Sequence, residues 1–427
     1  MTPNPQTQDA CAVRNRVILA LLALAMALAF FDRMNFSVAL AEVGFLRSFH
    51  LDDQDRGVLN SAFYWAYALL QMPAGWLVDR YGVRWPFAIG FLLWSAATAA
   101  TAAVGSLVSL VALRVLLGVG ESVLSPVMMR WIRLNIPESR RGLAVGIVML
   151  GSKLGPALGA PLSAWLMLQY GWPRMFLLLG LVPVFWIVPW LLLVRDTPAP
   201  ALPRQSEFGV GASPLASIAV VAVLIASFCY QYFIYFCLTW MPAYVVESFH
   251  MDITAMGWYS MVAFGGTAVI AALAGHAADR IIARGRNPLR VRTSFAIAGL
   301  ALASTEMIAV FTAHRGAALF FPAFALSAAG LATANHWALG QLLVPARLSG
   351  KMAGMQACAA GLPGIVAPLS TAWLKSASGG YVVPIITVAA FLMLGIASYL
   401  VVLRYAGGLT NGGAASPDPE RSDPAPR

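Results

Sequence analysis

Apolar residues in this chain come in long runs with short polar segments between them. Twelve of these runs are close to the ~20 residues that cross the hydrocarbon core of a bilayer as a helix, and they form two sets of six. The first set covers about 17–39, 57–79, 85–104, 107–129, 142–168 and 173–194, and the second about 216–243, 256–278, 293–313, 317–341, 352–375 and 381–403. The pattern therefore predicts twelve membrane-spanning helices.

The segments outside these runs predict two tails and a linker. Residues 196–214, between the two sets, are rich in Pro, Ser and Gly, which favours a cytoplasmic linker. We expect residues 1–16 to form a cytoplasmic tail, and residues 405–427, rich in Gly, Pro, Ser and Asp, to form a disordered one. The predicted membrane domains are residues 17–195 and 215–404.

Composition excludes a soluble fold. Apolar residues make up 59% of the 427 residues and charged residues only 11%, against about 25% charged in an average soluble protein, so lipid must cover most of the surface. The net charge of +10 does not indicate nucleic acid, because the basic residues lie in short loops and form no basic segment with interleaved aromatics.

The positions of the basic residues predict the orientation in the membrane. With both termini inside, 20 of the 28 Lys and Arg residues fall on the cytoplasmic side, five on the opposite side and three within spans. Positive charges accumulate on the cytoplasmic side of membrane proteins. We therefore expect a multi-pass protein of a bacterial-type inner membrane with both termini in the cytoplasm.

Two motifs recur at equivalent positions of the two sets. Gly-x-x-x-Asp-Arg follows the second run at 75–80 and the eighth at 275–280, and Ala-Pro-Leu-Ser starts at Ala160 in the fifth run and Ala367 in the eleventh. The halves are therefore related, which predicts an all-α integral membrane fold of twelve transmembrane helices as two six-helix bundles. Parallel repeats of this kind are typical of transporters that bind substrate between the halves near the midplane.

These motifs resemble the major facilitator superfamily. The Gly-x-x-x-Asp-Arg loops are its most specific signature, and RVLLGVGES at 114–122 resembles its fourth-span motif. Residues 30–39, 59–82 and 228–244 more narrowly resemble the anion:cation symporter family. The resemblance implies a secondary active transporter for proton-coupled uptake (symport) of a small organic anion, such as a sugar acid, tartrate or phthalate, by alternating access.

One stretch departs from this family. Members that bind polyhydroxylated acids commonly carry two Asn residues in the eleventh span, where this chain has Ala357 and Gly361. Two amide groups suited to hydroxyls are therefore missing. This difference favours a smaller or less hydroxylated acid.

Five charged residues lie within the predicted spans of the first half, where a charge costs about 3 kcal/mol or more and marks a pathway. They are Asp32, Arg33, Arg114, Glu121 and Lys153. From their depths, at 1.5 Å of rise per residue, we predict a ladder in which Asp32 pairs with Arg114 and Glu121 with Lys153. The alternative is a neutralised scaffold network that holds spans one, four and five together.

The charged residues suggest distinct roles. Arg33 is the expected contact of a substrate carboxylate, since a guanidinium binds carboxylates bidentately and is always charged. A moving cation changes the proton affinity of a nearby carboxylate, so Arg114 can take part in proton coupling. The resemblance assigns the coupling itself to Asp32 and Glu121. Lys153 is expected either to contact substrate or only to pair with Glu121.

Residues with a weaker sequence signal for the substrate site come from both halves. They are Tyr64 in span two, Tyr230, Gln231 and Tyr235 in span seven, and Asn335 and His336 in span ten. The phenol of Tyr64 lies level with Arg33 and can donate to a carboxylate. The alternative for the aromatic residues is packing or an interface belt, and for His336 it is a hydrogen-bonded structural role. Glu306 lies in span nine, which is peripheral in the superfamily, and ranks low.

The repeated loops predict gating residues, and the glycine-rich spans predict close helix packing. We expect Asp79 with Arg80, and Asp279 with Arg280, to form gating salt bridges and helix-end charges that stabilise the outward-facing state without touching substrate. Small-residue seams that allow close helix approach are expected at Gly151, Gly155 and Gly159 in span five and at Gly354, Gly361 and Gly364 in span eleven.

Other function classes fit less well. The main alternative is a proton-driven exporter of small apolar or amphipathic compounds, which needs fewer fixed cations at its cavity wall. An enzyme is disfavoured, because the five histidines lack metal-ligand spacing and no Gly-x-Ser-x-Gly or His-Glu-x-x-His occurs. We expect no catalytic residue, metal or cofactor, and as partners a small organic anion, protons and the lipid bilayer. Monomer is the superfamily default.

Overall fold

The computed structural model describes residues 5–196, 217–345 and 348–412, and all regular structure within them is helical. Ten stretches of these residues are long and apolar enough to cross a membrane. One of them, Arg140–Leu193, holds two spans, because Gly171 adopts a left-handed φ of 79° that breaks the helix. The more polar helix Asp53–Tyr81, 29 residues long, completes the twelve predicted spans.

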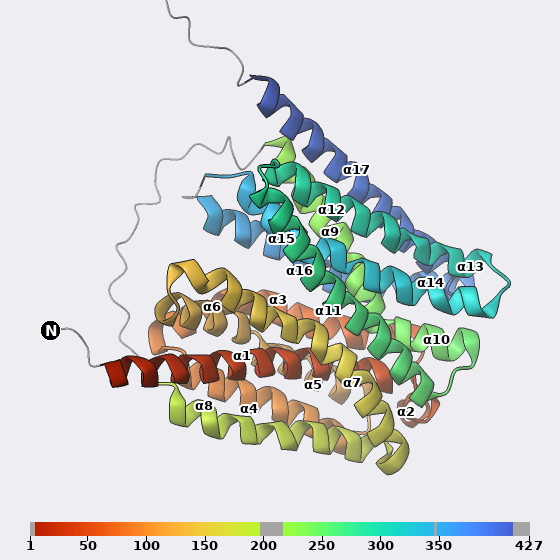
Figure 1. Cartoon of the computed structure of the whole chain (residues 1–427). Coiled ribbons are helices and arrows are strands. Elements are labelled where there is room, and N and C mark those ends of the chain that lie inside the picture. The colour runs from red at the N-terminus through yellow and green to blue at the C-terminus, as the bar shows by residue number, and fades with distance from the viewer. Residues whose placement is uncertain (1–4, 197–216, 346–347, 413–427) are drawn as a thin grey trace, which may run out of the picture.

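The helices of the first half are α1 (Pro5–Ala39), α2 (Val43–Phe49), α3 (Asp53–Tyr81), α4 (Arg84–Ala100), η1 (Thr101–Ala103), α5 (Leu107–Glu121), α6 (Leu124–Asn135), α7 (Glu138–Leu181), η2 (Val182–Trp186) and α8 (Ile187–Leu193). The helices of the second half are α9 (Ile218–Thr239), α10 (Met241–Phe249), α11 (Ile253–Ala283), α12 (Pro288–Ala303), η3 (Ser304–Met307), α13 (Ile308–Phe311), α14 (Arg315–Ala328), α15 (Gly330–Leu342), α16 (Ser349–Ser378) and α17 (Val382–Gly412). Figure 1 shows the two halves as two bundles lying side by side.

The predicted linker and carboxyl-terminal tail lie largely beyond the described residues, whereas most of the predicted amino-terminal tail lies within them. Of the expected linker 196–214, residues 197–214 fall outside them, as do residues 413–427 of the expected carboxyl-terminal tail. Helix α17 continues past residue 404 to Gly412. Helix α1 begins at Pro5, within the expected amino-terminal tail.

Both halves build the loop after their first span in the same way. His50 follows the last residue of α2 and His250 that of α10, and both histidines adopt left-handed backbone angles, with φ of 53° and 51°. This conformation is uncommon outside glycine. Two residues later, Asp52 and Asp252 cap α3 and α11 by accepting backbone N–H bonds. The internal repeat therefore extends to a turn that the sequence motifs did not include.

The predicted seam in span five is confirmed, and it packs α7 against α1. A Cβ at Gly155 would lie 2.4 Å from the carbonyl oxygen of Ala27, and Gly151 and Gly159 also face α1 closely. In span eleven only Gly364 is in such a contact, against the ring of Tyr64.

The two halves meet mainly along two helix pairs, α3 with α16 and α7 with α11, and α1 adds contacts to α9 and α10. The contacts are tight at the end of the molecule that carries α2 and α10, which we call the α2/α10 end (Figure 1). A Cβ at Gly57 would lie 2.5 Å from the Cβ of Ala372, and one at Gly257 would lie 2.9 Å from the Cα of Pro161. The opposite end, where α1 begins and the chain passes from the first half to the second, we call the linker end.

The same helix faces lie in open space toward the linker end. Gly75 is 18 residues from Gly57, which is five helical turns and therefore the same face of α3, yet a Cβ there would meet no atom within 4 Å. Gly354 has the same spacing from Ala372 on α16 and is equally free. Met72 of α3 is 86% exposed. The halves therefore touch at the α2/α10 end and diverge toward the linker end.

Candidate functional site

Four charged side chains are buried together in the first half. Asp32 and Arg33 come from α1, Arg114 and Glu121 come from α5, and each is 5% exposed or less. Two are cationic and two are anionic, so the cluster can be neutral as a whole. This neutrality matters because an unpaired charge in such surroundings is strongly unfavourable.

Arg33 and Glu121 form the central ion pair. The Nη2 and Nε atoms of Arg33 donate to the same carboxylate oxygen, Oε2 of Glu121, at 2.8 and 3.2 Å. The other oxygen, Oε1, has no partner among the described residues. The predicted pairing of Glu121 with Lys153 is therefore wrong, because Arg33 occupies that place.

The predicted pairing of Asp32 with Arg114 is also wrong as an ion pair. Asp32 accepts a hydrogen bond from Asn35, one turn along α1, at 3.0 Å. Arg114 donates from Nε to the backbone carbonyl of Leu59 at 3.2 Å, and its Nη1 is left without a partner in the described part of the chain. The two residues still lie within electrostatic reach of each other.

The fourth span is interrupted next to Glu121. Helix α5 ends at Glu121 and α6 starts at Leu124, although the sequence predicts one continuous span. Pro126 has no N–H to donate to the carbonyl of Ser122, one turn earlier, and its ring clashes with that carbonyl. The regular hydrogen bonding of the fourth span is therefore interrupted directly after Glu121, while Ser122 and Val123 keep helical backbone angles.

Aromatic rings surround the Arg33 guanidinium. Its central carbon lies 4.2 Å from the ring centre of Phe30, 4.8 Å from Phe63, 4.9 Å from Tyr67 and 5.9 Å from Tyr64. Such contacts stabilise a cation away from water. Of these four rings the sequence analysis predicted only Tyr64. Phe63 and Tyr67 are one helical turn apart on α3, so their spacing already indicates that they lie on the same face of that helix.

Tyr64 brings the second half into this site. Its ring lies 4.7 Å from that of Tyr235 on α9, in an edge-on arrangement that crosses between the halves. Gln231 lies one turn before Tyr235 and is half-buried. The structure therefore brings Tyr64 and Tyr235 together beside Arg33.

Lys153 faces the region between the halves without an ion pair in the described part of the chain. It is half-buried on α7, two turns from Gly146, where a Cβ would meet no atom within 4 Å. It lies within electrostatic reach of His336 in the second half. Lys153 is thus a cation available to a group that enters between the halves.

His336 belongs to a polar cluster of the second half. Its Nδ1 lies 3.4 Å from the hydroxyl of Ser227, and Gln356 donates both to that hydroxyl at 3.2 Å and to the His336 carbonyl at 2.8 Å. The ring centre of Tyr230 lies 4.7 Å from that of His336 in a tilted arrangement, and the Tyr230 hydroxyl bonds to Thr333. Sequence reasoning missed Gln356, which is fully buried on α16.

Asn335 and the repeated loops form other networks. Asn335 donates to the Leu331 carbonyl and accepts from Arg292, which also pairs with Asp279 at 2.7 Å. In the first half Asp79 pairs with Arg130. The Asp79–Arg130 pair lies within the first half and the Asp279–Arg292 pair within the second, so neither pair joins the halves. The guanidinium of Arg80 lies over the ring of Tyr81, and Arg280 shows no ion pair in the described residues.

Two further features of the second half lie apart from the Arg33 cluster. Glu306 is 4% exposed, and its Oε2 has no partner among the described residues. A cavity of about 430 Å³ at the α2/α10 end is lined by residues that include Tyr244, Arg315 and Tyr381. Among the described residues, no three His, Cys, Asp or Glu side chains are grouped to hold a metal ion.

Known proteins resemble this chain in sequence and fold. Residues 22–368 match the Major Facilitator Superfamily. The chain is 26% identical to a D-galactonate transporter of Escherichia coli over 91% of this chain and 96% of that protein, and 28% identical to a probable sulfoacetate transporter of Cupriavidus necator over 90% and 93%. Its fold matches an inward-facing, unoccupied bacterial homologue of the human lysosomal transporter Spinster with a TM-score of 0.77 and 17% identity, over 92% of this chain and 97% of that one. The chain belongs to the major facilitator superfamily and is a multi-pass membrane transporter, not an enzyme.

Proposed function

We propose that the chain is a secondary active transporter that takes up a small organic anion together with protons by alternating access. The observation that carries the proposal is the buried Arg33–Glu121 pair, in which one guanidinium is held by one carboxylate oxygen. The transporters of D-galactonate and sulfoacetate to which the chain is similar carry organic acids by name. A carboxylate substrate and Glu121 would therefore compete for Arg33.

This competition couples the anion to a proton. While Glu121 is ionised it holds Arg33, and a substrate carboxylate would have to displace it. Protonation of Glu121 removes its charge and frees Arg33, which then binds the substrate carboxylate in its place. One proton and one carboxylate entering together leave the net charge of the cluster unchanged, which avoids an unpaired buried charge. Asp32 and Arg114, in the same cluster, are the proposed secondary coupling residues.

The remaining contacts of the substrate would come from both halves. Tyr64 and Tyr235 meet beside Arg33, and Lys153 faces the space between the halves. On α16, Ala357 is exposed, and a Cβ at Gly361 would meet no atom within 4 Å. This face offers no amide to hydroxyl groups, which favours a small acid with few hydroxyls. Tyr230, Gln231, Asn335 and His336 are proposed as further, more distant contributors.

The distribution of positive charge supports the proposed orientation in the membrane. With both termini in the cytoplasm of a bacterial-type inner membrane, the α2/α10 end is the outer end and the linker end faces the cytoplasm. The contacts at the α2/α10 end then correspond to an inward-facing state of a monomer. Asp79, Arg80, Asp279 and Arg280 are proposed to act as gates at the cytoplasmic end in the other state.

Uptake into proteoliposomes tests the proposal. Labelled galactonate, tartrate, lactate, phthalate and benzoate are offered with an imposed inward proton gradient, to the parent protein and to Glu121→Gln. We expect one acid to accumulate in a gradient-dependent way in the parent only. Glu121→Gln should still exchange internal for external substrate, since Arg33 remains free to bind the acid.

A matched control separates the proposed proton site from a general loss of folding. Glu138→Gln changes an exposed carboxylate at the start of α7 and should leave accumulation unchanged. Gradient-dependent accumulation by Glu121→Gln at the parent's level would remove Glu121 from the mechanism. If no acid accumulates with folded parent protein, the exporter alternative takes the place of uptake.

A further inference from the structure

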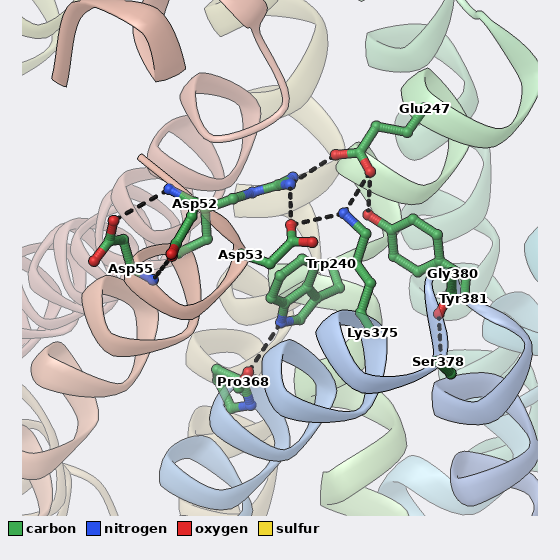
Figure 2. A network of polar contacts seen from close by, with 11 residues as sticks. Asp52, Asp53, Asp55, Trp240, Glu247, Pro368, Lys375, Ser378, Gly380 and Tyr381 are labelled. Atoms are coloured by element: carbon green, nitrogen blue, oxygen red, sulfur yellow. Dashed lines mark hydrogen bonds and ion pairs between the residues drawn. The ribbon is translucent and has the colours of Figure 1, made fainter. Parts of the chain in front are cut away.

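Four charged side chains from both halves form a closed ring at the α2/α10 end (Figure 2). Arg56 Nη1 donates to Asp53 at 2.9 Å and to Glu247 at 2.7 Å. Lys375 Nζ donates to Asp53 at 2.7 Å and to Glu247 at 2.6 Å. Each cation therefore binds both carboxylates, and each carboxylate binds both cations.

The ring divides evenly between the halves. Asp53 and Arg56 lie at the start of α3 in the first half, whereas Glu247 on α10 and Lys375 in the last turn of α16 lie in the second. Two of the four contacts cross between the halves, Arg56 with Glu247 and Lys375 with Asp53. The other two, Arg56 with Asp53 and Lys375 with Glu247, stay within one half.

Aromatic groups of the second half enclose the ring. Arg56 and Lys375 lie 4.9 and 5.6 Å from the ring centre of Trp240, which is 1% exposed. The Tyr381 hydroxyl donates to Glu247 at 3.0 Å. The side chains of Arg56 and Lys375 are only 4% and 11% exposed, whereas those of Asp53 and Glu247 are 25% and 33% exposed. The two cations are therefore shielded from water, while the two carboxylates keep some contact with it.

We propose that Asp53, Arg56, Glu247 and Lys375 form a partner-exchange latch that holds the α2/α10 end closed and opens without leaving any of its charges unpaired. The proposal rests on the alternating access of the proposed function. When the halves separate, the two crossing contacts break and the two contacts within the halves remain. A single ion pair between the halves would instead leave one bare charge on each side, which is costly wherever water is restricted.

A charge exchange inside the second half tests the latch directly. Glu247→Lys together with Lys375→Glu keeps an opposite-charge pair within that half, but each crossing contact then joins like charges. Spin labels at Val43→Cys on α2 and Val382→Cys on α17, both exposed, report the separation of the halves at this end. Cys11 and Cys358 are replaced by Ser, while Cys229 and Cys237 are buried and are left in place.

We expect a longer label distance in the exchanged protein. The ratio of open to closed populations should rise roughly tenfold, which is about 1.4 kcal/mol, because both crossing ion pairs are lost. Adding Asp53→Arg with Arg56→Asp restores opposite charges at every contact and should return the short distance. The matched control exchanges two exposed charges at the start of α7, Glu138→Arg with Arg140→Glu, and should leave the label distance at this end unchanged.

The distances are measured without substrate or proton gradient, so they report on the latch whether or not the chain carries an organic acid. An unchanged short distance in the exchanged protein overturns the proposal, as does a folded four-site variant that stays open. If the four-site variant does not fold, Asp53→Asn with Glu247→Gln replaces it. This pair of changes removes both crossing ion pairs and should also lengthen the distance, and a distance equal to the parent's would again refute the latch.

Discussion

Neighbouring residues on one helix can have different partners, and Asp32 and Arg33 show why. Successive residues point about 100° apart around a helix, so only one of the two can face Glu121 directly. Arg33 does so, while Asp32 bonds to Asn35 on its own helix. Their charge within an apolar span predicts a functional role for both Asp32 and Arg33. The rotation of α1 relative to α5 then decides which of them contacts Glu121.

At this scale, Arg33→Gln should destabilise the protein, because it leaves Glu121 buried without its cation. Removing one partner of a buried pair costs about 3–5 kcal/mol, a value that protonation of the remaining carboxyl group would reduce. We expect the thermal unfolding midpoint in detergent to fall for Arg33→Gln and to recover most of the loss in Arg33→Gln/Glu121→Gln. Neither variant should accumulate substrate. Equal midpoints for the single and double variants would argue against energetic coupling of the pair.

Helices in this fold approach one another where glycine permits it. Gly155 of α7 lies against the backbone of α1, whereas Gly146 on the same helix borders open space. Both are glycines within the same predicted span, and only their place in the bundle distinguishes a helix contact from a free surface. The same holds for α16, where Gly364 packs against another helix while Gly354 and Gly361 border open space.

The seam predicts opposite outcomes for two similar changes in α7. Gly155→Val places a Cβ 2.4 Å from the Ala27 carbonyl oxygen, so α1 and α7 must move apart, at a cost of about 1–3 kcal/mol or more. Gly146→Val meets no neighbour and should leave stability close to that of the parent. The comparison is made by thermal unfolding of both purified variants, and similar losses in the two would contradict the packing described for α1 and α7.

At the scale of the whole molecule, the contacts between the halves are unevenly distributed. In the described part of the chain, the two ion pairs that cross between the halves, Arg56–Glu247 and Lys375–Asp53, both lie at the α2/α10 end. The ion pairs of the repeated loops, Asp79–Arg130 and Asp279–Arg292, stay within their halves. This asymmetry gives the molecule one closed and one diverging end.

The latch should respond to acid in a defined direction. Burial alone would raise the pKa of Glu247, but Arg56 and Lys375 lower it below the usual value overall. A carboxylate with a lowered pKa in the folded state contributes its full stabilisation above the unfolded value of roughly 4.3 and loses it as the pH falls through the folded value. We therefore expect the midpoint difference between the parent and Glu247→Gln to be constant from about pH 8 to 6 and to shrink below about pH 4. A difference that grows on acidification would contradict this assignment.

The amino-acid sequence by itself determined the twelve spans, the repeated halves, the family and four of the buried charges, Asp32, Arg33, Arg114 and Glu121. These features depend on local composition, because a run of about 20 apolar residues enters the bilayer as a helix whatever its neighbours are. The tertiary structure alone decided which charges pair, which glycines touch another helix, and which end is closed. Arg56 and Glu247 are 191 positions apart, and Asp53 and Lys375 are 322 apart. Their contacts depend on the rotation and tilt of whole helices, which no local pattern records.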